Sequence, residues 1–282
     1  MVIESMTSPK EAEREPFQMF FVGTLYATIA LFLSLWIFKE QASLVFVFLT
    51  ALACVPLMYR TLKYEESKDV KINSQGKIFK EHKRALSFFV YLFIGFVVAL
   101  TIWYVILPQE MVSSLFSTQT LTINRINSQF TGSAANLQAF SVILANNIRV
   151  LIFCILFSFF YGAGAIFILS WNASVIATAV GAFIRSNLAS YAHYIGFVKI
   201  AAYFNVFSVA ILKYMTHGVF EIGAYFVGGL AGGIISVAII RHTLGDKSFS
   251  KVLLDSINLL VLAIGLLVLA ALVEVFVTPM FF

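Results

Sequence analysis

The chain has 282 residues, of which 60% are hydrophobic and only 12% are charged, and its formal net charge is +5. A soluble domain of this length has about twice that charged fraction, so the composition excludes a soluble protein and predicts a polytopic integral membrane protein. The apolar stretches are long and continuous, without the alternation of barrel strands, so the membrane segments are predicted to be helices.

The N-terminal part is predicted to consist of a cytoplasmic amphipathic segment, 1–16, and a transmembrane hairpin, 17–59. Ser8 before Pro9 and charged helix formers is typical of a helix start. The apolar stretch 17–38 is too long for a signal peptide, and no small-residue cleavage pattern follows Trp36. We therefore expect it to stay as the first membrane helix, with 42–59 as the second.

Residues 60–85 form a basic connection, with eight Lys and Arg residues between Arg60 and Arg84. Cytoplasmic loops beside membrane segments collect such residues, so this connection and the N-terminus are predicted to be cytoplasmic. Seven crossings then place the C-terminus outside. Nucleic-acid binding is not expected, because the segment is short, mixed in charge and flanked by membrane segments.

The remaining chain, 86–282, is predicted to be a transmembrane core with an outward-facing connection at 108–138. Its membrane segments are predicted at 86–107, 140–169, 172–184, 219–240 and 252–277. The stretch 199–215 is apolar but interrupted by Asn205 and Lys213, and it could complete the fifth crossing, lie in the interface or re-enter the membrane. The predicted fold is therefore an all-α bundle of about seven transmembrane segments with one or more broken or re-entrant helices.

A histidine and a glutamate, His217 and Glu221, lie one helical turn apart at the start of the apolar run that ends at Ile240. Ionisable residues at membrane depth are costly and need a specific reason. Steps of three or four residues from Glu221 reach Gly228 and Gly232, so the carboxylate shares a face with small residues and is expected to point at another helix. The predicted intramembrane polar cluster comprises Asn146, Asn147, Arg149, His217, Glu221 and Glu274, and the predicted helix-packing glycines are Gly162, Gly228 and Gly232.

No catalytic or cofactor motif is found in the sequence. The two cysteines and four histidines have no zinc-type spacing, no nucleophile is framed by a hydrolase signature, and no glycine pattern lies between a strand and a helix as a phosphate loop requires. We therefore predict a non-enzymatic protein without a cofactor or metal site.

Four short motifs occur in a particular order: Ala145 to Val150, Trp171 to Ala173, Thr216 to Glu221, and Glu274 to Pro279. Together they resemble the stage II sporulation protein M family, over the chain from about Leu86 to Pro279. The first hairpin looks like an N-terminal addition to the five-helix family core, as in archaeal-type members. Two positions depart from the family pattern, which usually has proline at Thr216 and glycine at Ala173.

The resemblance implies a small, largely non-catalytic membrane protein. In spore-forming bacteria, members of this family act with peptidoglycan-degrading partners and hold an enzyme complex at the membrane. Because members also occur in organisms that form no spores, the family name is a better guide to fold than to process.

Two functions are compatible with the sequence. The favoured one is a scaffold or subunit of a membrane complex, in which the polar cluster locks or gates the helix bundle. Its expected partners are the lipid bilayer and a membrane or extracytoplasmic protein, and a homo-oligomer is also considered. The alternative is a transporter or channel for an ion or small solute, in which Glu221 binds a cation or proton and His217 tunes its charge. A role in lipid chemistry is a weaker idea, because no nucleophile has a matching base.

Overall fold

The computed structural model describes residues 15–71, 75–129, 136–158, 163–191, 193, 196–241 and 246–281, and within these residues the protein is helical, without strands. Seven of the described helices are long and apolar enough to cross a membrane, so the all-α membrane fold is confirmed. The elements are α2 (Gln18–Ile37), the 3₁₀ turn η2 (Lys39–Gln41), α3 (Ala42–Lys71), α4 (Gln75–Ile106), α5 (Gln109–Leu115), α6 (Ser117–Gln129), α7 (Asn136–Ser158), α8 (Ala163–Ser190), α9 (Gly196–Arg241), α10 (Lys247–Leu272), the π turn η3 (Val273–Val277) and α11 (Thr278–Phe281).

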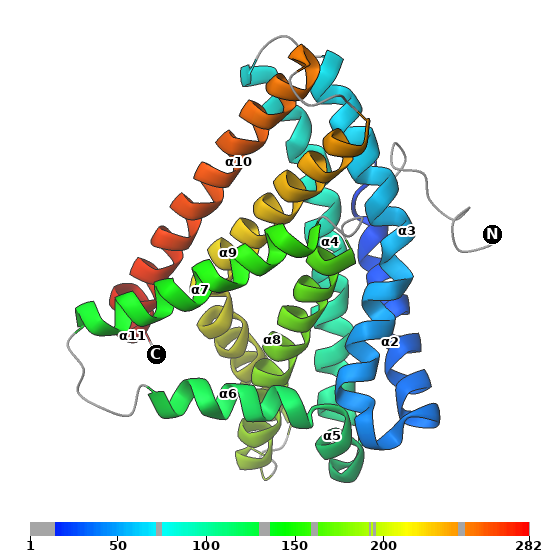
Figure 1. Ribbon diagram of the computed structural model, residues 1–282. Coiled ribbons are helices and arrows are strands. Elements are labelled where there is room, and N and C mark those ends of the chain that lie inside the picture. The colour runs from blue at the N-terminus through cyan, green and yellow to red at the C-terminus, as the bar shows by residue number, and fades with distance from the viewer. Residues whose placement is uncertain are drawn as a thin grey trace.

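The helices form two groups that meet along α8 and α9. Helices α2, α3 and α4 run side by side on one flank, and α7 and α10 lie on the other, with α8 and α9 between them (Figure 1). The end of α3 and the start of α4 lie at one end of the molecule, whereas α5 and α6 lie at the opposite end (Figure 1). The basic and the polar connection are therefore separated by the length of the bundle.

Helix α2 is attached to α4 by a close contact between two glycines. A Cβ atom on Gly23 would overlap the carbonyl oxygen of Leu92, and one on Gly95 would overlap that of Phe20. Thr24 Oγ1 lies 3.4 Å from the Gly95 carbonyl oxygen and donates to it. Without side chains at the crossing the two backbones approach closely, as is common between membrane helices.

Helix α9 is the central helix of the bundle. In the most apolar 18-residue stretch of α9, 83% of the residues are buried, against 17% in the corresponding stretch of α7. Its 46 residues correspond to about 69 Å of helix, more than twice the thickness of a hydrocarbon core. Figure 1 shows that the helix bends near its middle. The stretch 199–215 is the first half of this helix, and Asn205, which interrupts its hydropathy, lies exposed on the helix surface.

The predicted boundaries of the fourth and fifth membrane segments are wrong. Helix α7 ends at Ser158, and α8 runs from Ala163 to Ser190, so the predicted segment 140–169 joins two helices. Residues 159–162 are Phe-Phe-Tyr-Gly, which gives no polar break in the sequence, and their structure is outside the described residues. The polar residues near Asn172 do not end a helix either, because Asn172 Nδ2 donates to the Ile168 carbonyl oxygen, at 2.8 Å, within α8.

Two predicted segments outside the membrane contain regular structure where it can be described. The outward-facing connection 108–138 includes α5 and α6. In the basic connection 60–85, α3 continues to Lys71 and α4 begins at Gln75. The predicted N-terminal amphipathic helix, 1–16, lies almost entirely outside the described residues.

Candidate functional site

A buried amide joins two helices at the centre of the site. Asn147 on α7 is 5% exposed, and its Nδ2 donates to Glu221 Oε1 on α9 at 2.5 Å. The hydroxyl of Tyr225, one turn further along α9, donates to Asn147 Oδ1 at 3.2 Å. The nitrogen and the oxygen of the Asn147 amide thus both form hydrogen bonds, and these bonds fix Glu221 and Tyr225 relative to α7.

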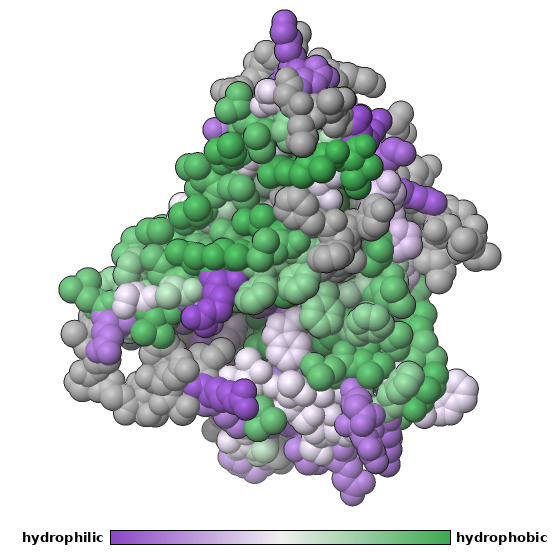
Figure 2. All heavy atoms as spheres, viewed as in Figure 1, coloured by the Kyte–Doolittle hydropathy of each residue, from purple (hydrophilic) through white to green (hydrophobic). Residues whose placement is uncertain are grey.

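These residues line a cavity of about 370 Å³ between helices α6, α7, α8 and α9 and the C-terminal turns. Figure 2 shows the surface hollowed between α6 and α7, with hydrophilic side chains beside the hollow. We call eight polar residues of its wall the cavity cluster: Asn146, Asn147, Asn172, His217, Glu221, Tyr225, Glu274 and Thr278. Lys213 and Tyr214 also line the cavity. The apolar wall consists of Ile123, Val142, Ile143, Val150, Val175, Ile176, Ala179 and Ile222.

The C-terminal side of the cavity is built on a π turn. Residues Val273–Val277 form this wider turn, which places Glu274 and Thr278 in the cavity wall. Pro279 lies in the first turn of α11, and because a proline has no N–H, the carbonyl four residues earlier lacks its usual α-helical donor. Thr278 Oγ1 donates to the Val273 carbonyl oxygen, at 3.2 Å, and lies 3.5 Å from His217 Nδ1. Such π turns within α-helices are frequent at functional sites.

The structure places one predicted cluster residue elsewhere. Arg149 lies on the exposed side of α7 and is not part of the cavity wall. The reason is helical geometry, because a residue two positions after Asn147 points about 200° away around the helix. Lys213, which the sequence analysis did not include among the site residues, does line the cavity, but its ammonium lies 5.6 Å from the ring centroid of Phe183, which is not a wall residue.

The predicted packing glycines on α9 face α7. A Cβ atom on Gly228 would overlap Leu151, and one on Gly232 would lie 3.0 Å from the Ile155 carbonyl oxygen. Both glycines therefore serve contacts within this chain. Gly162 lies outside the described residues.

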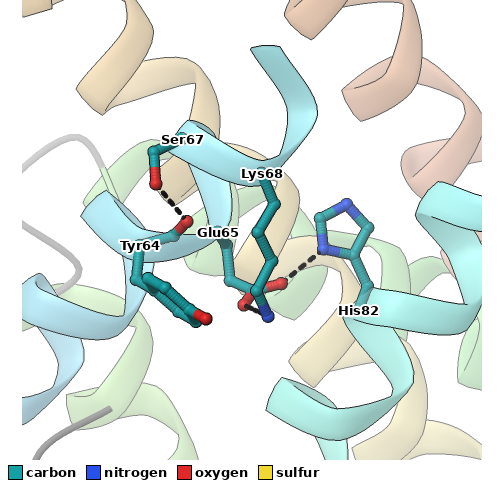
Figure 3. Close-up of polar contacts among 5 residues, drawn as sticks. All are labelled: Tyr64, Glu65, Ser67, Lys68 and His82. Atoms are coloured by element: carbon teal, nitrogen blue, oxygen red, sulfur yellow. Dashed lines mark hydrogen bonds and ion pairs between the residues drawn. The ribbon is translucent and has the colours of Figure 1, made fainter. Parts of the chain in front are cut away.

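A second polar cluster lies where α3, α4 and α9 meet at the other end of the bundle. Glu65 is 0% exposed and lies between Lys68 and His82: Lys68 Nζ is 2.6 Å from Glu65 Oε1, and His82 Nδ1 is 2.7 Å from Oε2 (Figure 3). Glu66, 1% exposed, forms an ion pair with Arg241 at the end of α9. We call these residues the α3 ion cluster: Glu65, Glu66, Lys68, His82 and Arg241.

The α3 ion cluster was not predicted, because residues 60–85 were interpreted from their charge as a connection between membrane segments. A usable signal was present. Buried positions on α3 continue at helical spacing from Met58 and Leu62 to Glu65 and Glu66, so the two carboxylates continue the buried stripe of the helix.

The fold and the cavity define a class of protein: a polytopic helical membrane protein with a polar cavity among its membrane-spanning helices. The chain matches the family model of Stage II sporulation protein M over residues 44–279, most of its length, and it belongs to this family. No curated protein and no solved structure matches the chain. The match begins in α3 and so includes the second helix of the predicted N-terminal hairpin; the predicted domain boundaries stay predictions.

All four motifs that carry the family resemblance contribute to one cavity. Asn146 and Asn147 come from the first motif, Asn172 from the second, His217 and Glu221 from the third, and Glu274 and Thr278 from the fourth, as the cavity lining shows. Residues that are up to 132 positions apart in sequence, from 146 to 278, are therefore brought to one place by the fold.

Proposed function

We propose that this membrane protein is a non-catalytic scaffold or subunit of a membrane complex, which pairs with its partner through the exposed face of α7. The observation that carries the proposal is the position of Arg149. It lies on the exposed side of α7 together with Ile152, Phe153 and Leu156, at the spacing of one helix face. An arginine near the middle of a membrane helix costs about 2.5–3.5 kcal/mol on insertion scales, unless it is paired.

The described residues offer Arg149 no hydrogen-bond or ion-pair partner, so an acceptor from outside the chain is favoured. A carboxylate on a partner helix fits best, because a guanidinium binds a carboxylate through two parallel hydrogen bonds. The apolar side chains around Arg149 would then be covered by the same helix. The competing explanation is that the arginine extends along the helix to lipid headgroups.

The test is mild detergent extraction of the tagged protein from its own membranes, followed by mass spectrometry of what co-purifies. A stoichiometric partner is expected with the wild type and is expected to be lost with Arg149→Met. Arg149→Lys distinguishes a partner carboxylate from lipid headgroups as the acceptor, because a lysine also reaches headgroups but cannot form two parallel hydrogen bonds with a carboxylate. Lys39→Met, an exposed basic residue on η2, is the matched control and is expected to keep the partner. Equal capture by all variants would contradict the proposal.

We further propose an orientation in the membrane, with the N-terminus and the ends of α3 and α4 in the cytoplasm and the C-terminus outside. The basic residues between Arg60 and Arg84 support it. The α3 ion cluster is then at the cytoplasmic end, and the cavity, which α6 borders with Ile123, opens toward the outer side. Labelling of single cysteines at Glu40 and Asp246 by a membrane-impermeant reagent in intact cells tests this: only the first is expected to react.

A second candidate function, transport of a small solute or ion, is favoured by the cavity. If the polar residues served only to hold the helices together, a cavity of about 370 Å³ beside two carboxylates would not be required. Reconstitution into liposomes tests it, and flux no higher than in empty vesicles would count against transport without affecting the scaffold proposal.

A further inference from the structure

The cavity wall carries two carboxylates that form no ion pair within the described residues. Glu221 accepts one hydrogen bond, from Asn147, and in the described part of the chain Glu274 has no hydrogen-bond or ion-pair partner. Arg149 lies on the exposed face of α7, outside the wall. Lys213 lines the cavity, but its ammonium lies 5.6 Å from the ring centroid of Phe183 and forms no ion pair with a described carboxylate. The two carboxylates therefore share this space without an ion pair to a described cation.

The space is too large for a bare metal ion. A cavity of about 370 Å³ could hold roughly a dozen water molecules at about 30 Å³ each, and it lies within the range of pockets for small organic molecules. Among the described residues, no group of three or more His, Cys, Asp or Glu side chains could hold a metal ion. An inorganic ion would thus meet few ligands and much unfilled volume.

The cavity wall combines two kinds of side chain. It carries the two carboxylates and the amides of Asn146, Asn147 and Asn172, and it also carries branched aliphatic side chains from α6, α7, α8 and α9. A molecule that contacts both kinds needs a positive group and an apolar body. The amide of Asn147, bonded at both ends, holds Glu221 in place before such a molecule arrives.

We propose that this cavity binds a small organic cation, a primary ammonium carried on an apolar body, with Glu221 and Glu274 as the groups that recognise the charge. The ammonium lies between the two carboxylates, and the apolar body packs against Ile143, Ile176 and Ile222. The inference concerns binding alone and stands whether or not the chain transports the molecule or joins a complex.

The test uses three molecules of the same shape and different charge: phenethylammonium, 2-phenylethanol and phenylacetate. Each is titrated into the purified full-length protein in detergent, and the melting temperature is followed by circular dichroism. A ligand that binds the folded protein raises the melting temperature in a saturable way. Phenethylammonium is expected to do so, and the neutral and anionic molecules are expected to have no such effect.

The variants Glu221→Gln and Glu274→Gln locate the effect. Each is expected to weaken the apparent affinity for phenethylammonium about tenfold, which is the loss of one charge-assisted contact. The two carboxylates lie on different elements, so one variant remains informative if the other does not fold. Glu110→Gln changes an exposed carboxylate on α5 outside the cavity and is expected to bind as the wild type does.

Three results would overturn the proposal. One is an equal response, or none, to the cation and to its neutral counterpart. Another is an undiminished response to phenethylammonium in both glutamine variants, which would place the binding elsewhere. The third is stabilisation by magnesium chloride but not by phenethylammonium, which would assign the carboxylates to an inorganic ion.

Discussion

The cavity cluster and the α3 ion cluster both bring carboxylates into a bundle of apolar helices, but the partners of the carboxylates differ. In the α3 ion cluster, Glu65 lies between Lys68 and His82, and Glu66 pairs with Arg241. In the cavity cluster, Glu221 accepts one hydrogen bond, from Asn147, and Glu274 lies in the cavity wall without an ion pair among the described residues. The difference separates buried carboxylates that are ion-paired from carboxylates that are not, and it is the reason why we propose ligand binding only at the cavity.

The two arrangements have different energetic consequences. Removing one partner of a buried ion pair leaves an uncompensated charge and costs about 3–5 kcal/mol. Amide hydrogen bonds between membrane helices contribute only about 0.6–2 kcal/mol each. We therefore expect the α3 ion cluster to govern the stability of the bundle and the cavity cluster to govern what it binds.

A large loss of stability is expected for Arg241→Met, which removes the ion pair between Arg241 and the buried Glu66. Because the Arg241 side chain is 41% exposed, we expect a loss of about 2–3 kcal/mol, below the range for fully buried pairs. The measurement is the free energy of unfolding in mixed detergent micelles. Arg149→Met, an exposed arginine on α7, is the matched control and should leave the stability of the isolated protein unchanged.

A smaller effect is expected for the contact between Glu65 and His82. A double-mutant cycle with Glu65→Gln and His82→Ala should give a coupling energy of about 1–2 kcal/mol, the range for a hydrogen bond that involves a charged group. Strictly additive losses in the same unfolding assay would show that the 2.7 Å contact contributes nothing of its own.

Asn147→Ala should lower the free energy of unfolding by about 1 kcal/mol, less than the changes to Arg241 and to the Glu65–His82 contact. It nevertheless removes the two hydrogen bonds that Asn147 makes between α7 and α9. The existing cavity lets the released groups reach water, which limits the penalty. A loss as large as that of Arg241→Met would mean that the cavity cluster is a structural lock.

The smallest effect is expected for Tyr225→Phe, which removes one hydroxyl that donates at 3.2 Å. The ring is 2% exposed and keeps its packing, so the cost should stay below about 1 kcal/mol. The same variant should retain the response to phenethylammonium, since the hydroxyl donates to Asn147 and does not carry the charge recognition.

Much of the fold could be predicted from the sequence because hydropathy and segment length are strong signals. Helices α2 and α10 lie close to where they were predicted. The boundary between α7 and α8 could not be predicted, since residues 159–162 are apolar and the hydropathy does not fall there. The continuity of α9 was also not evident, because Asn205 and Lys213 interrupt the apolar pattern, although in the fold Asn205 lies on the helix surface and Lys213 lines the cavity.

The cavity cluster was predictable in part for a different reason. His217 and Glu221 lie on one helix, so their shared face follows from spacing alone, whereas the approach of Asn147 depends on how α7 packs on α9. The placement of Arg149 with the cluster was an error of helix geometry that the two-residue spacing could have prevented. Glu65 and Glu66 were judged by their charge, although their spacing from Leu62 continues the buried face of α3.

The measurement that tests this account most directly is the free energy of unfolding of Glu65→Ala beside that of Glu221→Ala. The first variant strips Lys68 and His82 of their shared carboxylate at a fully buried position, and a loss of about 3 kcal/mol or more is expected. The second removes the hydrogen bond from Asn147 and enlarges a cavity that exists already, so its loss should stay below about 1 kcal/mol. Equal losses in the two variants, or a larger loss for Glu221→Ala, would contradict the division between a structural and a binding cluster.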